Sequence, residues 1–89
     1  SSNTKKPEEQ FTKLFREWVE NGTAIANWMK NHIHELEQNT EATISNREFQ
    51  NMLRRDFEIY NKLVIFDPEL KEDPIFNRGR DFYKSLIRT

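Results

Sequence analysis

Cysteine is absent from this chain of 89 residues, which removes disulfide bonds and thiol chemistry. Glycine occurs only twice, so a glycine-rich phosphate loop is also excluded. The sequence contains no run of about 18 apolar residues that would span a membrane, and it shows no signal segment. The lack of cysteine fits a cytoplasmic or nuclear protein, and we expect an intracellular location.

The chain also lacks a marked excess of charge of either sign. The 14 basic and 15 acidic residues give a net charge of −1, which provides no overall attraction to nucleic acid or to an anionic membrane. Aromatic residues make up 12% of the chain, and disordered chains are poor in such residues. We therefore expect one folded domain over residues 7–89, preceded by a flexible tail at residues 1–6.

Apolar residues recur at helical spacing in three stretches, and no stretch alternates for long enough to form a paired strand. The pattern predicts an all-α fold, a single compact domain of about four helices in an orthogonal or up-down bundle. The expected helices lie near residues 7–21, 24–38, 45–63 and 74–88, with a loop at residues 39–44.

The expected helix ends depend on residues that suit caps. Asn21-Gly22 is predicted to end the first helix, because glycine readily forms a left-handed cap. Thr23 can then cap the second helix. Ser45 and Glu48 have the S-x-x-E spacing of a capping box, in which each side chain satisfies one free backbone N–H group.

The hydrophobic core is predicted from the large residues of the four helices. The third stripe covers an arc of about 160°, wider than a stripe that faces one neighbour. This helix is therefore either central, with two neighbours, or it meets another molecule. The residues expected to be largely buried are Phe11, Phe15, Trp18, Trp28, Met29, Leu36, Phe49, Leu53, Phe57, Tyr60 and Phe82.

Two polar residues interrupt the apolar stripes: His32 at the centre of the second and Asp56 at the centre of the third. An unpaired buried carboxylate is costly, so Asp56 needs a hydrogen-bond donor or stays neutral. If the two helices are neighbours, a His32–Asp56 hydrogen bond would satisfy both side chains. Alternatively, one of them faces a partner molecule, or each reaches water near a helix end or groove.

No arrangement of residues indicates catalysis or metal binding. His32 and His34 are two residues apart on a predicted helix and point about 200° apart, so they cannot share one ion. Zinc also needs three or four converging ligands. No nucleophile is paired with a base. We expect no enzyme activity, no catalytic residue, no cofactor and no metal.

The large aromatic content and the wide third stripe favour a protein–protein interaction domain of adaptor or regulatory type, because such residues dominate interfaces. It would bind a partner helix, or a second copy of itself, through an exposed apolar helix face. The residues expected to bind the partner are Met52, Arg55, Asp56, Ile59 and Val64.

The alternative is a domain that binds nucleic acid or phosphate through its basic C-terminal helix, because a local basic cluster can contact phosphates. Nucleic acid is the less favoured partner, since acidic residues precede the basic cluster in sequence and basic residues also complement the end of a helix dipole. The residues that would contact phosphate are Arg78, Arg80, Lys84 and Arg88.

Overall fold

The computed structural model describes residues 7–88, and this part of the chain is all-α, as predicted. The expected flexible tail at residues 1–6 lies outside the described residues. The elements are α1 (Pro7–Asn31), α2 (Ile33–Gln38), α3 (Thr40–Ile44), α4 (Arg47–Phe66), the 3-10 segment η1 (Pro68–Glu72) and α5 (Pro74–Leu86).

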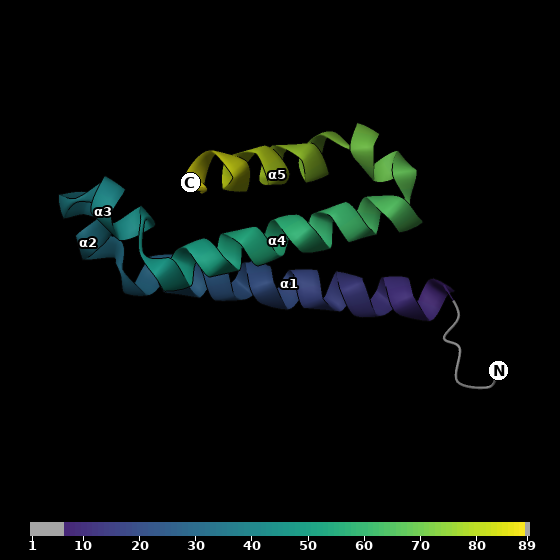
Figure 1. Cartoon of the computed structure of the whole chain (residues 1–89), viewed down its shortest axis with the longest axis horizontal. Helices are drawn as coiled ribbons and strands as arrows, with labels where there is room; N and C mark the ends of the chain where they lie inside the picture. Colours follow the sequence, from purple (N-terminus) through teal and green to yellow (C-terminus); the bar gives the residue numbers. More distant parts are fainter. Residues whose placement is uncertain (1–6, 89) are drawn as a thin grey trace.

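The long helices form an up-down arrangement around α4. Figure 1 shows α4 between α1 and α5, with the chain reversing direction at each connection. Helices α1 and α5 therefore run in the same direction, and both pack against α4. The short helices α2 and α3 lie at one end of the molecule, and η1 lies at the other.

Helix α1 continues through Asn21-Gly22, so the predicted end at this point is wrong. Gly22 has no positive φ angle and stays helical. The Asn21 side chain is buried and donates a hydrogen bond to the Met52 carbonyl oxygen of α4 at 2.9 Å. The Thr23 hydroxyl donates to the Val19 carbonyl oxygen instead of capping a new helix. Packing against α4 thus outweighs the helix-breaking tendency of one glycine.

The chain turns at His32 instead. The backbone there leaves the helical region, with φ −116° and ψ 25°. The His32 Nδ1–H group donates to the Trp28 carbonyl oxygen at 2.8 Å, and the imidazole stacks on the Trp28 ring with centroids 3.9 Å apart. The Nδ1–H group of His32 therefore has its hydrogen-bond partner within the turn that separates α1 from α2.

The segment predicted to be a loop at residues 39–44 contains α3, and the cap of α4 lies one residue later than predicted. The Asn46 Oδ1 atom accepts hydrogen bonds from the backbone N–H groups of Glu48 and Phe49. Ser45 has a helical backbone, and its hydroxyl turns back to donate to the Glu41 carbonyl oxygen. Asn46, and not Ser45, is therefore the cap of α4.

The core consists of two apolar clusters along α4. The first, near α2 and α3, contains Ile25, Trp28, Ile44, Phe49 and Leu53. The second, near η1, contains Ile59, Tyr60, Leu63 and Phe76.

Two residues predicted to be core are exposed. Phe15 keeps 45% of its surface accessible and Phe82 keeps 51%. Each lies on the flank of its helix instead of on the face toward α4. The prediction of burial at these two positions is therefore wrong.

Candidate functional site

The predicted exposed face of α4 does not exist. Ile59 is only 4% exposed and belongs to the second core cluster, while Met52 and Val64 are partly buried against the two clusters. The physical reason is that α4 is central and its wide apolar arc is covered by α1 on one side and α5 on the other. Only Arg55, of the five predicted partner-binding residues, is exposed.

An uncharged, exposed face lies on α1 instead. Phe15 and Val19 are 45% and 49% exposed, and Gly22, Thr23 and Ala26 continue the same face. Their spacing of i, i+4, i+7, i+8 and i+11 places all five side-chain positions on one side of the helix. The remaining exposed surface of α1 is rich in charges. The sequence contains this signal as a local absence of charge, which a search for apolar stripes does not detect.

The opposite wall of this surface is formed by α5. Tyr83 lines the same hollow as the α1 face, and Phe82, 51% exposed, lies about 100° around α5 from it, on the side away from Arg80. We call the hollow the α1/α5 groove. It has a volume of about 340 Å³ and is lined by Trp18, Val19, Gly22, Thr23, Ala26, Asp56 and Tyr83.

Small residues form the middle of the α1 wall of the groove. A Cβ atom added at Gly22 would meet no atom of another element within 4 Å, and the same holds for Gly79 of α5. At the far end the two walls do meet, because the Trp18 and Phe76 rings lie with centroids 4.9 Å apart.

Asp56 lies at the floor of the groove, between the two core clusters. The side chain is 2% exposed, and its Oδ1 atom has no hydrogen-bond partner among the described residues. Burial raises the pKa of Asp56 to about 6, and a side-chain hydrogen bond from Trp18 partly opposes the rise. Burial also raises the pKa of Tyr83, and the nearby negative charge of Asp56 adds to this effect.

No cation of the described chain neutralises Asp56. The ion pairs of the described residues join Arg80 to Asp81 and Arg88 to Glu41. His32 does not provide a partner either, so the His32–Asp56 pair, one of the alternatives that the sequence left open, does not form. His32 stacks on Trp28, whereas Asp56 lies beside Trp18, about 15 Å away along α1.

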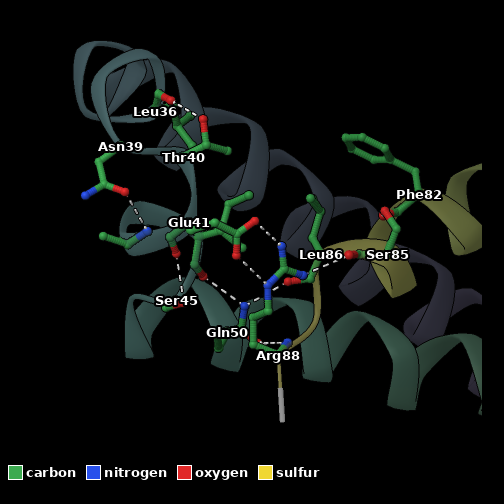
Figure 2. Close-up of polar contacts among 12 residues, drawn as sticks. Leu36, Asn39, Thr40, Glu41, Ser45, Gln50, Phe82, Ser85, Leu86 and Arg88 are labelled. Carbon is green, nitrogen blue, oxygen red and sulfur yellow. Dashed lines mark hydrogen bonds and ion pairs between the residues drawn. The ribbon is translucent and has the colours of Figure 1, made fainter.

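Arg88, predicted to bind phosphate, is held by the protein itself. Its guanidinium forms two hydrogen bonds with the Glu41 carboxylate, at 3.2 and 3.3 Å, and a third with the Ser85 carbonyl oxygen. Figure 2 shows these contacts next to Gln50. The backbone N–H group of Arg88 donates to Gln50 Oε1, and Gln50 Nε2 donates to the carbonyl oxygens of Ile44 and Leu86. This network attaches the end of α5 to α3 and α4.

Arg80 is also engaged. Its guanidinium lies over the rings of Phe57 and Tyr60, at 5.4 and 5.2 Å from their centroids, and pairs with Asp81 at 2.8 Å. Arg78 and Lys84 remain exposed. The four basic residues thus do not form one free cationic surface, which weakens the case for phosphate binding.

Comparison with protein-family models, with curated proteins and with solved structures gives no match to this chain. Within the described part, no three His, Asp or Glu side chains are grouped so that they could hold a metal ion. Among the described helices, none combines the length and the hydropathy needed to span a bilayer. The geometry of the α1/α5 groove is therefore the main guide to function.

Proposed function

We propose that this chain is a non-catalytic protein–protein interaction domain that binds a helix of another protein in the α1/α5 groove. The uncharged exposed face of α1 is the observation that carries the proposal. Interfaces are depleted of charge at their centre and enriched in aromatic residues, and this α1 face is uncharged and carries the exposed ring of Phe15.

A helix suits the dimensions of the groove. Its lining on α1 runs from Trp18 to Ala26, which corresponds to a length of about 12 Å or just over two helical turns. An amphipathic helix presents side chains at i, i+3, i+4 and i+7, and such a row suits a hollow between two helices that flank a third. The added helix would lie over Asp56 and cover the apolar residues on both walls.

A second copy of the chain is a poorer occupant. In a two-fold dimer the same surface meets itself, and a concave groove cannot fill an identical groove. A head-to-tail contact between copies would leave one groove open at the end of each chain of molecules. The proposed occupant is therefore a helix that belongs to a different protein.

The proposal is tested with a library of helical peptides of about 15 residues, long enough to fill the groove. Peptides selected on the wild-type protein are measured against two variants that place the same charge on α1. Ala26→Asp puts it in the groove, and Ala24→Asp puts it on the exposed outer face. We expect Ala26→Asp to weaken binding by about tenfold or more, because an unpaired charge is then buried at the interface, while Ala24→Asp has little effect.

Both variants should keep the helical circular dichroism signal and similar melting temperatures, because both positions are exposed. Equal loss in the two variants, or no loss in either, would contradict the proposed groove. If the molecular mass in solution rises with concentration for the wild type but not for Ala26→Asp, the occupant is instead a second copy of the chain.

A further inference from the structure

Asp56 is the least explained residue of the groove. A buried carboxylate normally accepts several hydrogen bonds or pairs with a cation, yet the Oδ1 atom of Asp56 has neither within the described residues. The side chain is only 2% exposed and still forms part of the groove lining. Asp56 therefore lies where a bound partner would come closest to α4, and one of its two carboxylate oxygens has no partner.

Resting on the proposed groove function, we infer that the partner helix carries a lysine or arginine at the centre of its apolar stripe and that this side chain binds the Asp56 carboxylate. Three features of the groove favour this pairing: the unpartnered oxygen of Asp56, the uncharged walls around it, and the absence of a described cation in contact with it.

The walls suit the long stem of a basic side chain. Lysine and arginine lay their methylene groups on apolar surface while the charged end reaches a polar partner. Val19 offers such a surface on α1, and the rings of Trp18 and Tyr83 flank the same hollow. An aromatic ring also attracts a nearby cation through its electron-rich face.

The two arginines of the described ion pairs are both engaged away from Asp56. Arg80, on the neighbouring α5, lies over the rings of Phe57 and Tyr60 and pairs with Asp81. Arg88 is fixed to Glu41. A cation from a partner would thus complete an ion pair with Asp56, whereas an apolar residue at the same place would leave the carboxylate buried and unpaired.

The test uses the helical peptide library with the positions of the apolar stripe randomised. Selection is carried out in parallel on the wild type, on Asp56→Asn and on Asp81→Asn. The last variant removes the same charge from an exposed carboxylate on α5. We expect one central position to favour Lys or Arg on the wild type and on Asp81→Asn, and to lose this preference on Asp56→Asn.

An affinity measurement then tests the ion pair between the basic residue of the peptide and Asp56. Replacing the central basic residue of a selected peptide by norleucine should weaken binding to the wild type by about tenfold or more, the factor that one charge-assisted hydrogen bond provides. The same replacement should have little effect on binding to Asp56→Asn, as a double-mutant cycle requires for a direct contact.

The outcomes separate the two proposals. Peptides that are sensitive to Ala26→Asp but show no central basic residue, or keep it on Asp56→Asn, would overturn the inference and leave the groove function intact. Failure to select any peptide that is sensitive to Ala26→Asp would overturn both.

Discussion

Asp56 weakens the fold at neutral pH. Its carboxyl group separates the two apolar clusters of the core, with Leu53 on one side and Ile59 on the other. Because burial disfavours the charged form, the folded state binds a proton more tightly at this residue than the unfolded state does. This cost in stability agrees with the proposed role of Asp56 in binding, because a partner cation would offset it.

The pH dependence of stability follows from this shift. The pKa of Asp56 rises from 3.8 to about 6 on folding, so its contribution makes the free energy of unfolding fall as pH rises from about 4 to about 7. Asp56→Asn removes the ionisation. We expect the variant to be more stable than the wild type by about 2–3 kcal/mol at pH 8, with little difference near pH 4.

Urea unfolding of both proteins across this pH range measures the effect. The same stability difference at both ends of the range would show that Asp56 is not charged and buried in the way described. Asp81→Asn serves as the control, because Asp81 is exposed and paired with Arg80.

At the scale of the helices, side-chain caps position the ends of the groove walls. Asp73 begins α5 by accepting hydrogen bonds from the backbone N–H groups of Ile75 and Phe76, with Pro74 at the first helical position. Asn46 has the same function for α4. These caps lie where the chain reverses, so they fix where each helix starts relative to its neighbours.

The cap of α4 can be tested by comparing alanine substitutions at the adjacent residues Ser45 and Asn46. Asn46→Ala removes two hydrogen bonds to backbone N–H groups, and we expect it to lower the free energy of unfolding by about 1 kcal/mol. Ser45→Ala removes only an exposed bond to a helix carbonyl, so its effect should stay within about 0.5 kcal/mol. Chemical denaturation measures both, and a larger loss for Ser45→Ala would favour the capping box over the Asn46 cap.

Across the whole molecule, the two walls of the groove are held at opposite ends. The Trp18–Phe76 contact joins them near η1. At the other end, Gln50 and Arg88 attach the end of α5 to α3 and α4 (Figure 2). Between these points α1 and α5 are separated by the hollow above Asp56. These contacts fix the position of α5 on both sides of the hollow.

Gln50 is the central residue of the second attachment. Gln50→Leu keeps a side chain of similar size but loses three hydrogen bonds, and it leaves the carbonyl oxygens of Ile44 and Leu86 without this donor. We expect a loss of about 2–3 kcal/mol in the free energy of unfolding, measured by urea unfolding, and faster amide exchange at Arg88.

Arg88→Ala is the comparison for this prediction. It removes the ion pair with Glu41, which is 76% exposed, and exposed pairs contribute less than about 1 kcal/mol. A larger loss for Arg88→Ala than for Gln50→Leu would place the attachment in the ion pair instead of in the buried amide.

The all-α class and the position of the last helix, predicted at residues 74–88 and found at Pro74–Leu86, followed from the sequence alone. So did the recognition that Asp56 interrupts an apolar stripe. These features are local, because the helical period and the caps depend on residues within a few turns of one another. The fold class was therefore accessible without any knowledge of how the helices pack.

Only the tertiary structure decided which faces are covered. Gly22 stays helical because α4 supports α1 on both sides of it, and Ile59 is buried because α4 has a neighbour on each flank. The packing of the helices also leaves Phe15 and Phe82 exposed. It places Asp56 at the groove and not beside His32. Each outcome depends on contacts between segments far apart in the chain, and the periodicity of a single helix does not determine which neighbour will lie against it.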